Sequence, residues 1–221
     1  MQRVQAEVQR KQVHIGAPGA AAELALPRNA VGLVVFAHGS GSGRRSPRNA
    51  FVAGVLHACG IATLLFDLLR EDEVGDRRKV FDIDLLAQRV AAAVDWAAHD
   101  AAAAGLPIGL FGASTGAAAA LRAAGECGGR VGAIVSRGGR PDLAGEDALA
   151  RVDAPTLLIV GALDTDVLAL NRDAMRSLRC PKRLEVVPGA SHLFEEPGTL
   201  DAAAHLAGAW FANHLASRRA A

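Results

Sequence analysis

A serine between two glycines is the part of this sequence best suited to chemistry. The pentapeptide Gly112 to Gly116 reads Gly-Ala-Ser-Thr-Gly and lies between the apolar run Pro107 to Phe111 and the small-residue run Ala117 to Leu121. When a strand turns into a helix across Gly-x-Ser-x-Gly, the serine adopts a strained backbone geometry and its Oγ rises above the sheet edge. Glycines suit the flanks because a Cβ there would collide with the returning helix. The pattern predicts a nucleophilic Ser114, with a simple strand-to-helix turn as the alternative.

A carboxylate and an imidazole follow two later apolar runs. Asp164 comes after the run Leu157 to Leu163, and His192 comes after Leu184 to Ser191. The chain order Ser, Asp, His matches a known arrangement of a catalytic triad. Because parallel strands present their carboxyl ends at one edge of a sheet, we expect Ser114, Asp164 and His192 to meet there.

Other residues compete for the acid and base positions. Asp166 lies close to Asp164, but Asp166 or Thr165 is placed to cap a helix that should begin near Val167. We therefore assign Asp164 as the acid. His192 follows a strand and precedes the last expected helix, whereas the remaining histidines are assigned to loops or helices: His14, His57, His99, His205 and His214.

A glycine-rich loop could supply the donors that such a site needs. The segment Phe36 to Gly43 follows the first expected parallel strand, and Gly39 should let its backbone come close to a substrate. We expect the backbone N–H groups of Thr115 and Ser40 to form an oxyanion hole. A phosphate cradle is the alternative, but the loop lacks the Lys-Ser/Thr ending of a P-loop and the spacing of a dinucleotide fingerprint. His38 is expected to hold the loop.

These groups together predict acyl transfer to serine. His192 would take the proton from Ser114, and Asp164 would fix the tautomer of the imidazole and stabilise its charged form. The serine would attack an ester-like carbonyl, and water would later release the acyl-enzyme. The expected substrate is a small ester or lactone, and neither a metal nor an organic cofactor is expected.

The elements that must position these residues alternate along the chain. Three short runs read as an opening antiparallel meander: Val4, Ala6 and Val8, then Val13 and Ile15, then Ala22 to Leu26. Near-continuous apolar runs then predict strands covered on both faces, at 33–37, 61–66, 108–111, 131–135, 156–160 and 183–187. Helices are expected at 47–59, 80–103, 115–124, 167–178 and 199–216. This order predicts an α/β fold with a mostly parallel central sheet and helices on both faces.

Composition restricts the other possibilities. The 221 residues fit a single domain, 1–221, and a formal charge of +1 gives no footprint for nucleic acid or an anionic membrane. Three distant cysteines without metal-ligand spacing read as buried hydrophobic residues, and no apolar leader precedes His14; we expect a cytoplasmic protein. The uncharged segment Ala101 to Leu121 holds Pro107 and several glycines, which argues against a membrane span. A homodimer is left open.

With these residues in place, the sequence resembles the α/β-hydrolases over nearly its whole length, and most closely their dienelactone hydrolase-like branch. Further similar stretches are Phe66 to Leu69, Val135 to Asp142 and Gly189 to Phe194. Some bacterial members are fused to phosphoribosyltransferase domains, and no such domain is expected here. The resemblance implies a compact enzyme with little or no cap. Dienelactone hydrolases proper use a cysteine nucleophile, so Ser114 points away from dienelactone itself while keeping carboxylic ester chemistry.

Two charged features remain open. Arg137 lies where a strand ends, beside the expected site, and could hold a substrate carboxylate or phosphate; a surface ion pair is the alternative, with Asp142, Asp67 or Glu71. The charge run Arg70 to Lys79 reads as a solvated loop rather than a lid over the substrate. Other chemistries of the same triad are a thioesterase, a peptidase or a cofactor-free haloperoxidase, and a noncatalytic binding module is the alternative of a different class.

Overall fold

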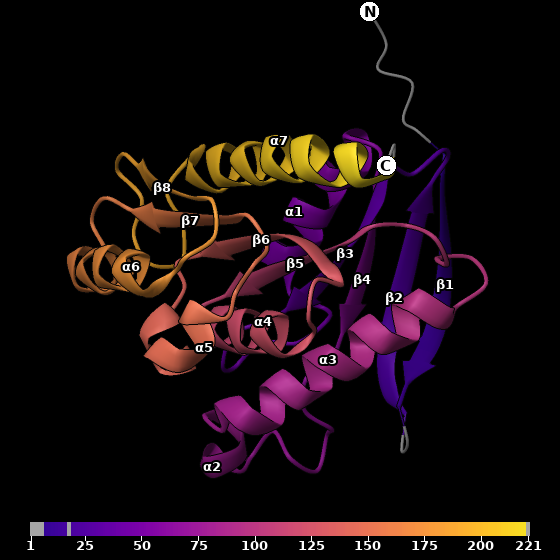
Figure 1. The fold of residues 1–221 in the computed structure, drawn as a ribbon, viewed down its shortest axis with the longest axis horizontal. Coiled ribbons are helices and arrows are strands. Elements are labelled where there is room, and N and C mark those ends of the chain that lie inside the picture. Colours follow the sequence, from indigo (N-terminus) through magenta and orange to yellow (C-terminus); the bar gives the residue numbers. More distant parts are fainter. Residues whose placement is uncertain (1–6, 17–18, 220–221) are drawn as a thin grey trace, which may run out of the picture.

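One sheet organises the chain. The computed structural model describes residues 7–16 and 19–219, and in that part of the chain eight strands pair in the order β1-β2-β4-β3-β5-β6-β7-β8 (Figure 1). β1 and β4 both pair with β2 in antiparallel fashion, and the remaining pairs are parallel. This confirms the mostly parallel sheet with antiparallel strands at its beginning. The strands are β1 Val8–Ile15, β2 Ala20–Pro27, β3 Gly32–Ala37, β4 Ile61–Phe66, β5 Ile108–Ala113, β6 Val131–Arg137, β7 Thr156–Gly161 and β8 Lys182–Val187.

Helices cover both faces of this sheet, as expected. α1 and α7 lie together on one face, while α3 and α4 pack side by side on the other (Figure 1). The helices are α1 Pro47–Ala58, α2 Arg77–Val80, α3 Ile83–His99, α4 Thr115–Glu126, the 3₁₀ turn η1 Pro141–Ala144, α5 Glu146–Ala150, α6 Thr165–Ser177 and α7 Thr199–Arg219. Between β6 and β7 the chain forms only η1 and α5, so no cap domain is inserted there.

Small side chains allow α4 to lie close against the sheet. Its residues 117–120 are all alanine, and each is at most 1% exposed. A Cβ on Gly112 of β5 would lie 2.3 Å from the Cα of Ala117, far inside van der Waals contact. The glycine therefore permits a backbone approach that no other residue would allow.

Several element boundaries differ from expectation. β1 is one continuous strand paired with β2 along its whole length, rather than separate short runs; the expectation for Val4 and Ala6 falls outside the described residues. The helix expected from residue 80 begins at Ile83, because the Asp82 carboxylate accepts the Leu85 N–H at 3.0 Å and caps it there.

Two of the three cysteines, Cys127 and Cys180, are buried as expected, whereas the expectation is wrong for Cys59, which is exposed. His57 lies on a helix, as expected, and is buried in α1 with its Nε2 2.8 Å from Thr63 Oγ1. Over the described part of the chain, every helix is too short or too polar to cross a membrane.

Candidate active site

Ser114 occupies a strained turn between β5 and α4. Its backbone has φ 50° and ψ −123°, a region that a residue with a Cβ rarely adopts. Gly116 makes the turn possible, because a Cβ at that position would lie 2.1 Å from the carbonyl oxygen of Ala37. Strain of this kind persists only where the surrounding structure enforces it, and it is frequent at active sites. The strand-turn-helix geometry predicted around Ser114 is present.

Asp164 and His192 are hydrogen-bonded to each other. The ring nitrogen Nδ1 of His192 lies 2.6 Å from Oδ2 of Asp164, whose side chain is only 13% exposed. Asp164 stands at the N-cap of α6 but makes no capping bond, so its carboxylate is left for the imidazole. α6 begins at Thr165, earlier than expected, and Asp166 lies exposed in the first turn of the helix. The pair expected from the sequence is therefore brought together. The expectation that Asp166 or Thr165 caps the helix is wrong, because both residues lie within the first turn of α6.

The end of β6 lies between this pair and the serine. The Arg137 carbonyl accepts the Ser114 N–H at 3.4 Å, and a Cβ on the next residue, Gly138, would lie 3.0 Å from the His192 carbonyl and 3.7 Å from its Nδ1. Among the described residues, however, no hydrogen bond joins the Ser114 hydroxyl to the His192 ring. Hydrogen bonds of catalytic groups are often long without substrate, and the His192 side chain is 37% exposed. The three side chains therefore lie at one edge of the sheet, and in the described part of the chain the Ser114 hydroxyl and the His192 ring are not hydrogen-bonded.

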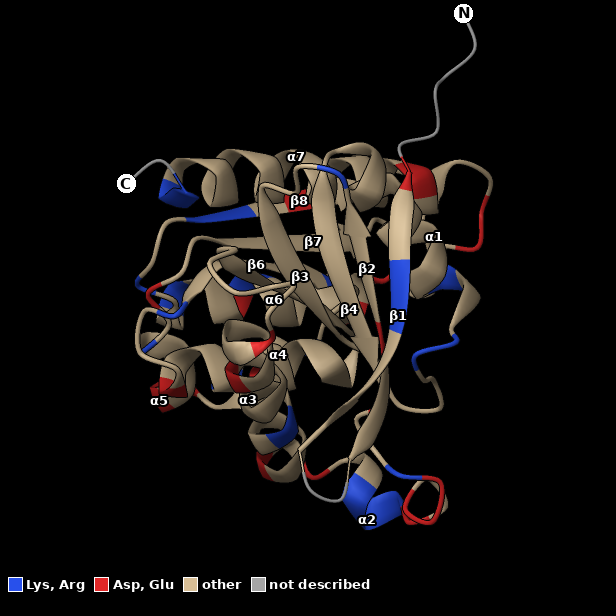
Figure 2. Cartoon of the chain, turned by 90° about the vertical axis from the view of Figure 1, so that its right-hand side faces the viewer, with Lys and Arg blue, Asp and Glu red and all other residues tan. Residues whose placement is uncertain are grey.

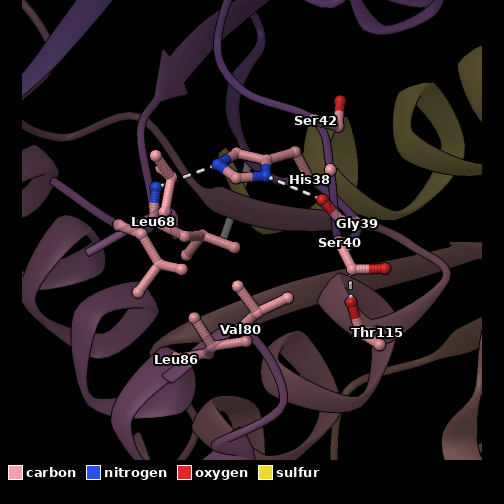
Figure 3. Close-up of a pocket in the computed structure, with 11 residues that line it drawn as sticks. His38, Gly39, Ser40, Ser42, Leu68, Val80, Leu86 and Thr115 are labelled. Atoms are coloured by element: carbon pink, nitrogen blue, oxygen red, sulfur yellow. Dashed lines mark hydrogen bonds between the residues drawn. The ribbon is translucent and has the colours of Figure 1, made fainter. Parts of the chain in front are cut away.

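His38 holds the glycine-rich loop. Its Nε2 accepts the Leu68 N–H at 3.0 Å, and its Nδ1 lies 3.1 Å from the Gly39 carbonyl, which fixes a neutral ring with the proton on Nδ1 (Figure 3). Burial lowers the pKa of His38 and keeps it in that form. This is the holding role expected from the sequence. The backbone of Gly39 passes close to Ser114, since a Cβ on Gly39 would lie 3.0 Å from Ser114 Cβ.

One of the two expected oxyanion donors is engaged. The Ser40 N–H donates to Thr115 Oγ1 at 3.0 Å (Figure 3), whereas the sequence led us to expect it to be free. Thr115 is the first residue of α4, so its own N–H has no partner within the helix. The Thr115 hydroxyl thus joins the glycine-rich loop to the start of α4.

An apolar cavity of about 270 Å³ opens beside the glycine-rich loop. Gly39, Ser40 and Thr115 line its polar side (Figure 3), and Thr115 directly follows Ser114 in the chain. We call it the apolar cavity; its hydrophobic lining comprises Leu68, Leu69, Val74, Val80 and Leu86. Sequence patterns could not reveal it, because its walls come from the loop after β4, the segment around α2 and helix α3.

A buried carboxylate fastens the wall of this cavity. Glu73 is 4% exposed and receives hydrogen bonds from Arg89 Nη1 and Nη2 at 2.6 and 2.9 Å and from Lys79 Nζ at 3.1 Å. The Arg89 guanidinium holds the pKa of Glu73 well below its usual range. The segment Arg70 to Lys79 is largely exposed, as expected, and consists of an acidic turn joined to the basic helix α2 (Figure 2). Glu73 is the buried exception and binds Arg89 of α3, and Val74 lines the cavity.

Arg137 is buried at the end of β6. It is 6% exposed, and across residues 7–16 and 19–219 neither a counterion nor a hydrogen-bond partner for its Nε and Nη1 atoms is present. Its guanidinium carbon lies 5.3 Å from the centre of the Phe194 ring, a cation–π contact. Burial first, and then the charge of Arg48, lower the pKa of Arg137 to about 10.

Two of the three carboxylates suggested as ion-pair partners of Arg137 bind other arginines. Arg140 binds Asp142 through Nε and Nη2 at 2.9 and 2.7 Å. Arg44 binds Asp67 through its backbone N–H at 2.8 Å and through Nε at 3.5 Å. The alternative of a surface ion pair is therefore wrong for Arg137.

Comparison with known proteins shows the family of this chain. A family model described as "Alpha/beta hydrolase domain" matches residues 30–210, and the chain belongs to the α/β-hydrolase family. It is dienelactone hydrolase-like: a dienelactone hydrolase structure from Anabaena variabilis is 50% identical, has a TM-score of 0.90, and is matched over 95% of this chain and 99% of its own. Est1E from Butyrivibrio proteoclasticus shares the fold, with a TM-score of 0.77 at 16% identity over 93% of this chain and 99% of its own.

Curated relatives carry a different name. Two proteins from strains of Mycobacterium tuberculosis, provisionally named phosphoribosyl transferases, are each 55% identical over 204 residues, which is 92% of this chain. The chain spans only 46% of the length of these relatives.

Proposed function

We propose that this α/β-hydrolase is a serine hydrolase that cleaves a small carboxylic ester or lactone through an acyl-enzyme on Ser114. One observation carries the proposal. The Asp164–His192 hydrogen bond of 2.6 Å lies at the same sheet edge as a serine held at positive φ. An acid, an oriented imidazole and a strained serine at one edge are the parts that acyl transfer requires.

The residues divide the work as follows. Asp164 occupies His192 Nδ1, which leaves Nε2 as the nitrogen that takes the Ser114 proton once the ring turns toward it. The Thr115 N–H is directed at the developing oxyanion. The Ser40 N–H becomes a second donor when the substrate oxygen displaces Thr115 Oγ1. His192 then activates the water that releases the acid product.

The apolar cavity suggests which part of the substrate enters beside the oxyanion donors. Its lining of leucine and valine side chains favours an uncharged hydrocarbon portion, and burial is worth about 25 cal/mol per Å² of apolar surface. At about 270 Å³ the cavity is below the usual size range for drug-like ligands. A short acyl or alkyl group is therefore favoured over a long chain.

A thioesterase on the same triad is the nearest alternative.

The phosphoribosyl transferase name of the mycobacterial relatives describes proteins more than twice as long as the matched segment. The α/β-hydrolase family model matches most of the present chain. Hydrolysis is therefore the better proposal for this chain.

A panel of short p-nitrophenyl esters, lactones and acyl thioesters tests the proposal on wild type and Ser114→Ala. We expect one substrate class to be turned over by the wild type and the variant to lose at least about 10³-fold in kcat. A fluorophosphonate probe should label wild type at Ser114. Equal turnover by both proteins, or no adduct on the folded wild type, would overturn the proposal.

A further inference from the structure

The guanidinium of Arg137 is the least satisfied polar group beside the candidate site. Two of its nitrogens are buried and unpaired, and within the described residues no hydrogen bond or ion pair reaches this side chain. An uncompensated buried charge is strongly destabilising. Such a group is retained where a ligand supplies the missing hydrogen-bond acceptors and the opposite charge. A buried group with a shifted pKa beside a nucleophile is typical of a functional site.

Positive rather than negative charge gathers around Arg137. Val135 packs in the apolar layer under α1 and α7, and Arg137, two residues further along β6, lies on the same face. Arg48, in the first turn of α1, is near enough for its charge to act on Arg137. That turn contains no acidic residue, and its backbone N–H groups add a positive helix end. Arg48 makes one ion pair, 3.5 Å long, with the exposed Glu195.

The position of Arg137 links it to the reacting groups. Its carbonyl binds the Ser114 N–H, and its side chain lies against Phe194, two residues after His192. The apolar cavity lies on the other side of Ser114, against the loops after β3 and β4. A substrate that reaches both regions would carry an apolar group at one end and an anion at the other.

We propose that Arg137, assisted by Arg48 and the start of α1, is an anion subsite that binds a carboxylate or phosphate group of the substrate. The planar guanidinium can form two parallel hydrogen bonds to such an oxyanion. The natural substrate would then be an anionic ester, with the scissile carbonyl between the subsite and the apolar cavity. The catalytic use of this subsite rests on the proposed hydrolase function, whereas its capacity to bind an anion does not.

Stability separates this role from a purely structural one. If Arg137 only supported the Phe194 loop, then Arg137→Met would lower the Tm. If it is an unpaired cation kept for a ligand, replacing it with an apolar chain of similar length removes a buried charge and leaves good packing on Phe194. We expect the Tm of Arg137→Met to rise by at least about 2 °C. A lower Tm would overturn the proposal.

Kinetics on matched esters measures the specificity. Mono-p-nitrophenyl glutarate carries a terminal carboxylate, and p-nitrophenyl pentanoate is a neutral ester of the same chain length. We expect Arg137→Met to lose about 10- to 100-fold in kcat/KM on the glutarate, mainly through KM, and less than threefold on the pentanoate. Arg137→Lys should recover part of the loss. Arg176→Met, which removes an exposed arginine of α6, is the control and should change neither rate. Equal losses on both esters would overturn the proposal.

Binding without turnover distinguishes a wrong subsite from a wrong function. In Ser114→Ala, monomethyl glutarate and inorganic phosphate should each raise the Tm, and the larger shift identifies the preferred oxyanion. The shift should vanish in the double variant with Arg137→Met. If wild type hydrolyses no ester but this shift is present, the hydrolase proposal fails and the subsite stands. If the shift survives loss of Arg137, the subsite proposal fails whatever the kinetics show.

Discussion

Adding one methyl group at Gly116 should inactivate the protein. A Cβ there would lie 2.1 Å from the Ala37 carbonyl oxygen and 2.4 Å from that of His38, while carbon and oxygen atoms ordinarily approach to about 3.3 Å. Gly116→Ala must therefore move the end of β3 away from α4 by about 1 Å. A displacement of that size in a reacting group costs about 10²-fold in rate, and loss of an oxyanion donor costs about 10² to 10³. We expect kcat to fall by about 10² to 10³.

The assay for this variant is hydrolysis of the best substrate of the ester panel, together with thermal unfolding. Gly54→Ala is the matched control, because Gly54 is also helical and a Cβ there meets no atom within 4 Å. That control should keep its activity and gain up to about 1 kcal/mol of stability from helix propensity. If Gly116→Ala kept its kcat within threefold of wild type, the glycine-rich loop would not be what sets the geometry of the site.

Three further predictions concern the rest of the site and the fold. Asp164→Asn should lower kcat by on the order of 10⁴, because an amide no longer selects the imidazole tautomer of His192; a loss below tenfold on the ester panel would contradict the assignment. Glu73→Gln should lower the free energy of unfolding by about 3 kcal/mol in urea, since it leaves Arg89 half-buried without its carboxylate, and should weaken the preference among acyl chain lengths; unchanged stability would refute this. Burial lowers the pKa of His57 from 6.5 to about 4, so below pH 6.5 the unfolded chain takes up a proton that the folded state resists. The free energy of unfolding is therefore unaffected by this group above pH 6.5 and falls by about 3 kcal/mol as the pH decreases toward 4. His57→Gln should remove this part of the pH dependence, measured by urea titrations at several pH values.

The sheet and the three candidate catalytic residues could be predicted because each depends on local pattern. Ser114, Asp164 and His192 each follow an apolar run, and parallel strands bring such positions to one edge. The Asp164–His192 hydrogen bond could be expected from that rule. Whether the Ser114 hydroxyl also bonds the His192 ring could not be predicted, because the orientation of a half-exposed imidazole depends on loop packing that no periodicity encodes.

Features that depend on contacts between distant segments were missed. Glu73 looked like one charge among many in a hydrophilic run, and its burial follows from Arg89, sixteen residues away on α3. The start of α6 was placed too late because Asp164 was not expected to occupy the N-cap without capping. The Ser40–Thr115 bond joins the glycine-rich loop to the first turn of α4, and these segments are distant in sequence. Local signals carry no information about these partners.

The unusual backbone at Ser114 belongs to the turn and not to the side chain. Gly112 and Gly116 enforce it by their packing, so any small residue placed between them inherits the same exposed position. Within this architecture a thiol could take over from the hydroxyl by a single exchange of oxygen for sulfur, leaving the imidazole, the carboxylate and the amide donors where they are. Exchanging serine for cysteine at this position would therefore change one atom and leave the scaffold as it is.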